Sequence, residues 1–486
     1  MRSEIYCYIN GVKHQVEGSH AFWTVSDYLR YQESLTGTKV VCAEGDCGAC
    51  TVLVSRLKSG ELQNYKTFNS CILFMFMLDG CHIITVEGLG NSQSLSEVQL
   101  EMIQNHGAQC GYCTPGFICS LSSLANDLKK YDKRNTEQKI KNYLTGNLCR
   151  CTGYEPIINA AKAINKEKVN LLSSLYNDSH ISNELLNLCT DSISLEYEDK
   201  RLFLPQSFTE AAGLKSKYPD ARIISGATDL GVLKNKARID FYNVISLNNI
   251  EEAYTLSEDV DVLAVGAKVS YHDLEVGIKK MYPDFSRLLH IFASPQIKNS
   301  GTLVGNLVNA SPIGDTIPFL LVVNANVELI SSARIRTIPI RDFIKDGYKN
   351  LDIKANEIVT RILIPKKDGE VKTYKVSIRK DLDISTVTMA VHFKLIGSQI
   401  EFLEVAFGGV GPRVVFSKKI AKACKNKEFD QELFSQLVDL VPAEITPLSD
   451  HRGSKDFRIL LCQNLLLKFS DEVIIENGLS FSKANI

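Results

Sequence analysis

The chain has 486 residues, which corresponds to about three domains at roughly 150 residues each. Apolar residues make up 44 % and charged residues 23 % of the chain, an ordinary globular composition. The formal net charge of −1 argues against a general nucleic-acid or acidic-membrane surface, because both require an excess of basic residues.

The N-terminal segment predicts neither export nor membrane insertion. Polar residues interrupt the apolar ones in MRSEIYCYING, unlike the apolar core of a signal peptide. The longest apolar run, residues 71–78, is far shorter than the roughly 20 residues of a membrane span. We therefore expect a cytoplasmic protein. The fourteen cysteines are then expected to be reduced, and clustered thiols in that compartment more often bind metal or do redox work than form disulfides.

The first part of the chain, residues 1–87, predicts a small sheet with one helix across it. Residues 3–17 read as two short strands joined by Asn10 and Gly11, the strongest hairpin turn signal. Residues 25–35 have helical spacing, and a strand resumes at TVLVSRL, residues 51–57.

The rest of the chain predicts a helical domain, a linker and two α+β domains. Helical periodicity recurs in four segments within residues 88–166, and residues 167–195 are rich in Asn, Ser and charge, which indicates a linker. Strands alternate with helices in residues 196–368, and we count GTLVGNLVNASP, residues 301–312, among the strands. Long strands followed by helices form the last domain, residues 369–486.

A first cysteine set has the spacing of a plant-type [2Fe–2S] site. Three cysteines separated by four and then two residues are followed by a fourth, twenty-one residues on. Gly45 and Gly48 let the loop bring backbone N–H groups close to sulfur. Zinc sites usually place their cysteines in two pairs, so zinc fits this triplet less well. The first cysteine set comprises Cys42, Cys47, Cys50 and Cys71.

A second cysteine set follows in the helical part, and by itself it fits a cluster, a zinc ion or a redox dithiol. Thr114 and Pro115 predict a helix start directly after its first pair. Thr152 and Glu155 have capping-box spacing directly after its second pair. Helix N-termini favour an anionic cluster. The second cysteine set comprises Cys110, Cys113, Cys149 and Cys151.

Taken together, these motifs resemble those of the molybdenum hydroxylases. The loop CAEGDCGACTV (42–52) resembles the family's first-cluster motif, and QCGYCTPGF (109–117) with GNLCRCTGYEPI (146–157) resembles its second-cluster motifs. The stretches IISGATDLG (223–231) and FASPQIKNSGTLVGNLVNASPIGD (292–315) resemble its two FAD-binding loops, and RKDLDIS (379–385) and AFGGVGPR (406–413) resemble motifs of its C-terminal flavoprotein domain.

The resemblance implies a multidomain α+β fold with four parts. These are a β-grasp [2Fe–2S] ferredoxin domain, a four-helix [2Fe–2S] domain, an FAD-binding domain of the vanillyl-alcohol-oxidase (PCMH) type and a domain like the C-terminal domain of the CO dehydrogenase flavoprotein. All eight cysteines of the two sets would ligate iron. Phe292 would lie against the flavin ring, and Gly226 and Gly305 would let N–H groups approach the pyrophosphate. The implied FAD contacts are Ile223, Ile224, Ser225, Gly226, Ala227, Thr228, Asp229, Leu230, Phe292, Thr302, Leu303, Val304, Gly305, Asn306, Asp315 and Lys375. The chain departs from the family pattern at Ala227, Val304, Gly314 and Leu382.

The resemblance also implies an electron-transfer role without a catalytic acid or base on this chain. A purine would be hydroxylated at a molybdopterin centre on a large partner subunit, and electrons would pass through both clusters to FAD and then to NAD+. Two small and two large chains would form a heterotetramer, as in xanthine dehydrogenases. The alternatives are the same subunit of an aldehyde or N-heterocycle hydroxylase, and a stand-alone NADH-dependent reductase.

Overall fold

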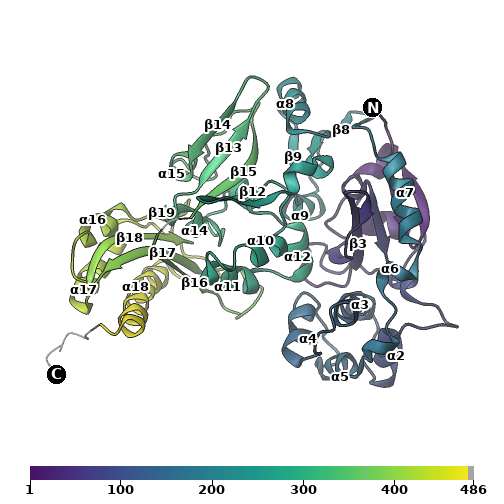
Figure 1. Cartoon of the computed structure of the whole chain (residues 1–486), viewed down its shortest axis with the longest axis horizontal. Helices are drawn as coiled ribbons and strands as arrows, with labels where there is room; N and C mark the ends of the chain where they lie inside the picture. The colour runs from purple at the N-terminus through teal and green to yellow at the C-terminus, as the bar shows by residue number, and fades with distance from the viewer. Residues whose placement is uncertain (367, 480–486) are drawn as a thin grey trace. The chain divides into compact units, whose positions relative to one another are not determined.

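A computed structural model describes residues 1–366 and 368–479, and its fold is α+β, as the sequence predicts (Figure 1). The chain divides into two compact units. The first contains Met1–Glu252 and Ser294–Gly301, and the second contains Ala253–Ala293 and the chain from Thr302 onward. Within the described part of the chain, no helix is both long and apolar enough to cross a bilayer.

The first unit begins with the predicted sheet, in the order β2-β1-β6-β3-β4 with β5 paired to β3. Asn10 and Gly11 take left-handed φ angles of 49° and 81°, which confirms the predicted hairpin turn. The helix expected over residues 25–35 is short, because α1 is followed directly by a π-turn over Tyr28–Gln32. The elements are β1 Ile5–Ile9, β2 Val12–Val16, α1 Val25–Asp27, β3 Thr51–Lys58, β4 Glu61–Leu62, β5 Lys66–Asn69 and β6 Cys81–Ile84.

The four predicted helices form the second part of this unit. Phe117, Leu121 and Leu124 of the longest helix have 0 % exposure, so its apolar stripe lies in the core that the helices share. The helices are α2 Glu97–Gln104, α3 Thr114–Lys130, α4 Glu137–Leu144 and α5 Glu155–Ala163.

The predicted linker is not an irregular segment. It forms α6 Leu172–Leu175 and α7 Asp178–Leu188, and Figure 1 shows α7 beside the sheet that contains β3. Ile181 and Leu185, four residues apart on one helix face, are buried together with Tyr8 of β1. The sequence did not predict this helix because its short apolar stripe lies among mostly polar residues.

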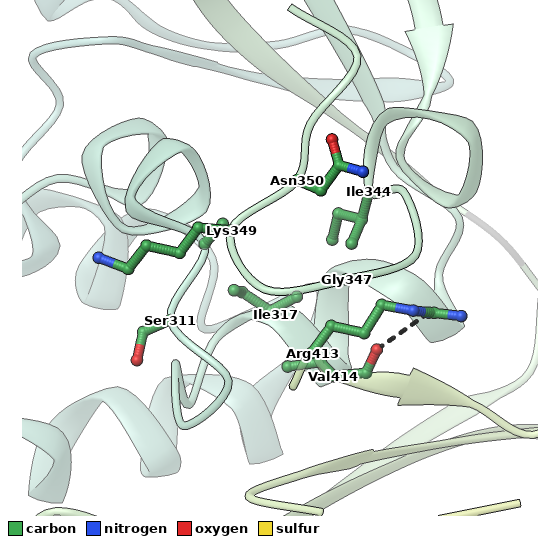
Figure 2. A pocket seen from close by; sticks show the side chains of 9 residues that line it. Ser311, Ile317, Ile344, Gly347, Lys349, Asn350, Arg413 and Val414 are labelled. Carbon is green, nitrogen blue, oxygen red and sulfur yellow. Dashed lines mark hydrogen bonds between the residues drawn. The ribbon is translucent and has the colours of Figure 1, made fainter. Parts of the chain in front are cut away.

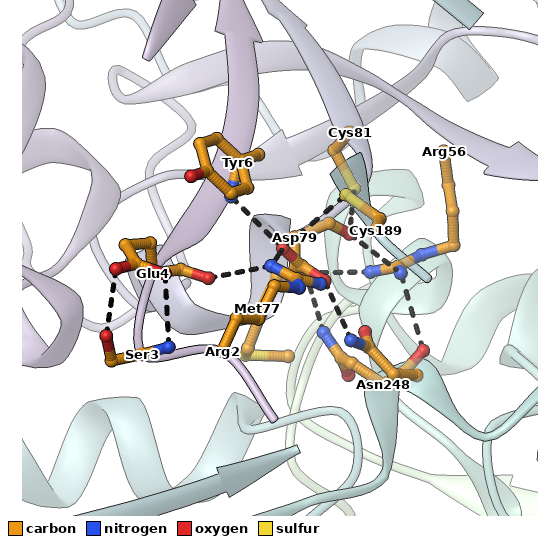
Figure 3. Close-up of polar contacts among 11 residues, drawn as sticks. Arg2, Ser3, Glu4, Tyr6, Arg56, Met77, Asp79, Cys81, Cys189 and Asn248 are labelled. Carbon is orange, nitrogen blue, oxygen red and sulfur yellow. Dashed lines mark hydrogen bonds and ion pairs between the residues drawn. The ribbon is translucent and has the colours of Figure 1, made fainter. Parts of the chain in front are cut away.

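The first unit ends with a four-stranded sheet in the order β7-β8-β10-β9. Asn249 links a buried ion pair of the ferredoxin part to this region. Arg2 donates to both carboxylate oxygens of Asp79, at 2.8 and 2.5 Å, and Asn249 donates to Asp79 at 2.7 Å. Nearby, Asn248 donates to the Met77 carbonyl at 2.6 Å (Figure 3). The elements are β7 Ile193–Tyr197, β8 Lys200–Leu204, α8 Phe208–Lys217, β9 Arg222–Ile224, α9 Thr228–Ala237, β10 Asn243–Ser246 and α12 Pro295–Ser300.

The second unit opens with a five-stranded sheet in the order β11-β12-β15-β13-β14. One prediction is wrong here, because residues 303–309 form helix α13 rather than a strand. The Thr302 hydroxyl accepts from the Gly305 N–H and starts the helix, and Leu303 and Leu307 are buried one turn apart. The elements are β11 Leu256–Glu258, β12 Val262–Gly266, α10 Tyr271–Gly277, α11 Pro283–Phe292, α13 Leu303–Asn309, α14 Ile317–Val322, β13 Asn326–Ile330, β14 Ile335–Pro339, α15 Ile340–Phe343 and β15 Ile358–Pro365.

The last part of the second unit is an antiparallel sheet in the order β16-β17-β18-β19, with helices packed on it. Phe393, Phe429, Phe434 and Phe469 meet in its core at ring-centroid distances of 4.7 to 6.5 Å. The elements are β16 Glu370–Val376, β17 Val387–Ile396, β18 Gln399–Gly408, β19 Val415–Phe416, α16 Lys418–Cys424, α17 Gln431–Leu437 and α18 Lys455–Asn477.

Candidate redox-cofactor sites

The four thiols of the first cysteine set come together in a chain of three contacts. Cys42 contacts Cys47, Cys50 contacts Cys71, and Cys42 also contacts Cys71. The hydrogen bonds that its sulfur accepts from Cys47 and Cys71 hold the pKa of Cys42 below its usual range. The contact with Cys42, followed by burial, raises the pKa of Cys47. The thiols are therefore close enough to share protons. An iron–sulfur cluster binds deprotonated thiolates, so its binding would displace these protons.

The loop that carries these thiols bends so that its N–H groups turn toward sulfur. Ala43, Gly45 and Gly48 take left-handed φ angles of 55°, 80° and 68°. The N–H of Cys47 donates to the sulfur of Cys42 at 3.4 Å. Successive N–H groups in such a conformation form a concavity that binds anions, which suits a negatively charged iron–sulfur cluster.

The second cysteine set forms two pairs. The sulfurs of Cys110 and Cys151 are 3.5 Å apart. Burial, followed by the hydrogen bond with Cys149, raises the pKa of Cys113 to about 12. Burial alone would raise the pKa of Cys149. Hydrogen bonds from the Thr152 side chain and from backbone N–H groups outweigh the effect of burial, so the pKa of Cys149 is lowered.

The helix starts near the second set differ in detail from the prediction. Cys113 itself, rather than Thr114, is the N-cap of α3. The predicted capping box is absent from this described segment: Tyr154, at φ 72°, is the N-cap of α5 without a side-chain cap. The Thr152 hydroxyl instead donates to the Cys149 sulfur and accepts from the Tyr154 N–H. The sequence signal thus located both helix starts but misassigned the capping atoms.

The donor sets fit two-iron clusters. Each set gathers four cysteines, and a [2Fe–2S] cluster needs four cysteines, two for each iron. The two sets are also joined directly, because the Leu148 N–H donates to the Cys47 carbonyl at 2.9 Å.

The first predicted FAD loop lies in the first unit, between β9 and α9. Ala227, at φ 58°, is the N-cap of α9 and supplies no side-chain cap, so first-turn N–H groups can receive a phosphate. The Ser300 hydroxyl donates to the Gly226 carbonyl at 2.6 Å, and a Cβ on Gly226 would lie 2.2 Å from the Ser300 carbonyl oxygen. Gly226 is therefore needed for the close approach of α12 to this loop. The predicted residues Ile223, Ile224, Ser225, Gly226, Ala227, Thr228, Asp229 and Leu230 all lie here.

The second predicted FAD loop lies in the second unit, at the start of α13. The Gly305 N–H, which we predicted to face a pyrophosphate, donates to the Thr302 hydroxyl at 3.0 Å. Asn306 accepts from the Thr316 hydroxyl at 2.7 Å. The loop is thus held by its own hydrogen bonds. Leu303 and Val304 are buried.

Two further predicted residues, Asp315 and Lys375, bind each other. The Lys375 ammonium lies 2.7 Å from Asp315, and both side chains are at most 6 % exposed. Ser385 donates to the other oxygen of Asp315 at 2.6 Å and also contacts Lys375. No sequence signal pointed to Ser385 individually, although it ends the RKDLDIS motif. Phe292 packs edge-on against Tyr271, with ring centroids 4.7 Å apart, and no pattern singled out Tyr271.

The AFGGVGPR motif closes a small hollow in the second unit (Figure 2). Arg413 pairs with Asp346 at 2.5 Å, and Lys349 donates to Asn309 at the end of α13 at 2.8 Å. The hollow, also lined by Ile317 and Asn350, has a volume of about 10 Å³, room for about one water molecule. The motif therefore fixes a surface loop and encloses no cofactor-sized space among the described residues.

Family models match along most of the chain. Residues 7–75 match a 2Fe-2S iron–sulfur cluster binding domain, and residues 85–162 match a [2Fe-2S] binding domain. Residues 196–367 match the FAD binding domain in molybdopterin dehydrogenase, and residues 372–473 match the CO dehydrogenase flavoprotein C-terminal domain. The chain thus combines two [2Fe-2S] domains, an FAD-binding domain and a CO dehydrogenase flavoprotein C-terminal domain. It therefore carries the iron–sulfur and FAD domains of an oxidoreductase.

Proteins that are similar to this chain include xanthine dehydrogenases. The chain is 29 % identical to xanthine dehydrogenase 1 of Arabidopsis thaliana, over 96 % of this chain and 39 % of that protein. It is also 29 % identical to xanthine dehydrogenase/oxidase of Rattus norvegicus, over 98 % of this chain and 39 % of that protein. The chain thus spans about two fifths of the length of these relatives.

Solved structures share the fold of part of the chain. The quinoline 2-oxidoreductase structure from Pseudomonas putida 86 matches with a TM-score of 0.53 at 24 % identity, covering 57 % of this chain and 97 % of that one. Carbon monoxide dehydrogenase from Hydrogenophaga pseudoflava matches with a TM-score of 0.52 at 22 % identity, covering 55 % of this chain and 94 % of that one.

Proposed function

We propose that this chain is the electron-transfer subunit of a xanthine dehydrogenase. A partner subunit with a molybdopterin centre hydroxylates hypoxanthine or xanthine, and NAD+ takes up the electrons at the flavin of this chain, in a heterotetramer of two small and two large subunits. When bound, the clusters supply one-electron transfer, and FAD converts between one- and two-electron transfer. The names of the relatives that align along nearly the whole chain support this assignment.

The observation that carries the proposal is the unequal exposure of the two cysteine sets. Cys110 and Cys151 are exposed, whereas Cys50 and Cys71 are 1 % exposed. Tyr112, next to the first pair of the second set, is also an exposed apolar residue. Exposed large apolar side chains beside an exposed cofactor site are typical of a docking surface.

Within the chain, the protein's own residues hold each group in place. The second set lies where a partner can donate electrons, and the first set is linked to it by the hydrogen bond from Leu148 to Cys47. The loop at Gly226 and the buried Asp315–Lys375 pair belong to the segments that we assign to FAD. No side chain is assigned as a general acid or base, since the hydroxylation chemistry belongs to the partner.

An anaerobic titration of the purified chain with NADH tests the electron path on this chain. We expect flavin absorption to bleach and two distinct [2Fe–2S] signals to appear in the EPR spectrum. Absence of any reduction by NADH, in protein that contains iron and flavin, would contradict the assignment of NAD+ as acceptor.

The Cys113→Ser variant tests the order of the path in the complex with the molybdenum subunit. We expect substrate-to-NAD+ turnover to stop while FAD stays bound, because the second cluster loses a ligand. Undiminished turnover would contradict the order. A panel of purines, aldehydes and N-heterocycles with the wild-type complex then identifies the substrate class. Co-purification of this chain with a large molybdenum subunit distinguishes the proposed function from that of a stand-alone reductase.

A further inference from the structure

The short helix α12 places one buried amide side chain against the contact between the two cysteine sets. Gln296 is 0 % exposed. Its amide nitrogen lies 3.0 Å from Asn147 Oδ1, 3.2 Å from Thr51 Oγ1 and 3.4 Å from Ser120 Oγ. These three partners belong to the second-set loop, to β3 directly after the first-set loop, and to α3. One donor group thus joins three segments that are far apart in the sequence.

Two of these partners hold the backbone of the first-set loop, and the third, Ser120, donates to Asn147 Oδ1 at 2.7 Å. Asn147 donates to the Gly48 carbonyl at 3.1 Å, and Thr51 donates to that carbonyl at 2.6 Å. One residue beyond Asn147, the Leu148 N–H donates to the Cys47 carbonyl at 2.9 Å. This last hydrogen bond connects a ligand residue of the first set to the residue that precedes ligand Cys149.

Glycines make this approach possible. A Cβ on Gly116 would lie 2.1 Å from the Gly48 carbonyl oxygen, and a Cβ on Gly48 would lie 2.1 Å from the Gly146 carbonyl oxygen. A Cβ on Gly146 would lie 2.1 Å from Oε1 of Gln296. The backbones of both loops and the amide therefore fill this space without room for another atom.

Burial of the Gln296 amide has a cost in stability. Its Oε1 is buried and has no hydrogen-bond partner among the described residues, and an unpaired buried acceptor destabilises a protein. An apolar side chain of the same length would avoid that penalty but would leave Asn147 and Thr51 without a shared donor. The side chain is thus better explained by what it positions than by packing alone.

We propose that Gln296 is a positioning residue for electron transfer between the two clusters, an inference that rests on the proposed function. It holds Asn147 and Thr51 so that the hydrogen bond from Leu148 to Cys47 keeps its geometry. That hydrogen bond then serves as a through-bond connection from one ligand set to the other.

Helix α12 extends the same connection to the first flavin loop. Ile297, the next residue, packs with Cys50, Cys71 and Ile72. Ser300, at the end of the helix, donates to the Gly226 carbonyl. A displacement of the first FAD loop would therefore be transmitted through this short helix to the contact between the two cysteine sets.

Hydrogen exchange at Leu148 tests the positioning role without any redox step. In Gln296→Met, which keeps the length of the side chain and removes the donor, we expect the Leu148 amide to exchange about tenfold faster, the factor that corresponds to loss of one buried hydrogen bond. Ser120→Ala removes one hydroxyl of the network and should change the rate in the same direction by a smaller factor. Ser120→Ala provides the same test if Gln296→Met does not fold.

Asn299→Leu is the matched control on the same helix. Asn299 donates to the Thr67 carbonyl at 2.9 Å, away from the contact between the cysteine sets. We expect it to leave the exchange rate of Leu148 unchanged. Equal rates in the wild type, Gln296→Met and Ser120→Ala, or equal acceleration in Asn299→Leu, would overturn the proposal.

Low-temperature EPR of the dithionite-reduced holoprotein separates this inference from the proposed function. We expect Gln296→Met to weaken the magnetic interaction between the two reduced clusters while both cluster signals keep full intensity. If NADH fails to reduce the wild type, the proposed function fails, but the exchange and EPR results still decide the role of Gln296. If the interaction is unchanged although Leu148 exchanges faster, the through-bond connection is overturned.

Discussion

The two cysteine sets each offer four thiols to a two-iron cluster, but their surroundings differ. In the first set Cys50 and Cys71 are buried and Cys42 and Cys47 are half-buried, whereas the second set precedes two helices and leaves Cys110 and Cys151 exposed. Solvent exposure and hydrogen bonds to sulfur are main determinants of cluster potential. The comparison teaches that one chain can place two sets of four cysteines in surroundings of different solvent exposure.

The largest expected effect comes from forcing the two sets apart. Gly116→Ala places a Cβ 2.1 Å from the Gly48 carbonyl oxygen, so either α3 or the first-set loop must move. We expect the free energy of unfolding of this unit to fall by about 3 kcal/mol and the magnetic interaction between the clusters to weaken. Urea unfolding and EPR measure the two effects.

Gly213→Ala provides the control for this substitution. Gly213 lies inside α8, and apart from its chain neighbours and the backbone of its own helix, no described heavy atom comes within 4 Å of the position that a Cβ would take there. Alanine at this position should therefore raise stability by up to about 1 kcal/mol through its helix propensity. A comparable loss of stability in both variants would refute the close approach at Gly116.

A pair of ligand substitutions sharpens the contrast in burial. Cys50→Ser puts a hydroxyl into a site that is 1 % exposed, whereas Cys110→Ser changes an exposed side chain. In iron-free protein we expect the first to lower the free energy of unfolding by about 1–2 kcal/mol and the second to leave it nearly unchanged. Thermal unfolding measures this, and iron analysis should show that each variant loses one cluster. Equal destabilisation would mean that the two sets do not differ in burial.

The smallest expected effect concerns the loop conformation of the first set. Ala43 takes a φ of 55°, which costs a non-glycine residue about 1–2 kcal/mol. Ala43→Gly removes that strain but adds flexibility to the unfolded chain, so we expect a net gain of about 0.5 kcal/mol. Chemical denaturation with duplicate measurements resolves a change of this size. A loss of stability would show that the Ala43 methyl makes contacts that outweigh its strain.

Local signals in the sequence predicted the elements that depend on local physics. The hairpin at Asn10 and Gly11 follows from turn chemistry. Ligand spacing grouped the cysteines into two sets, whose thiols lie in contact within each set, but it did not indicate which thiols contact each other. The strand predicted over residues 301–312 was wrong because an apolar run of that length suits both helix and strand, and only the cap at Thr302 distinguishes them. The apolar stripe of α7 was likewise too short to outweigh its polar surroundings.

Long-range contacts could not be predicted in the same way. Gln296 meets Thr51, which lies 245 positions earlier in the chain. Asp315 and Lys375 were predicted separately, as flavin contacts, and no pattern indicated that they form an ion pair with Ser385 beside it. Such contacts depend on how distant segments pack, and no local periodicity encodes that.

The short distance between two exposed sulfurs has a consequence for the maturation of the protein. Cys110 and Cys151 are 3.5 Å apart and open to solvent. In iron-free chain an oxidant can join them in a disulfide, and the pair then offers no thiolate to iron. Cluster assembly therefore competes with oxidation at this one site, and the reducing state of the surroundings sets how many newly made chains become competent to carry electrons.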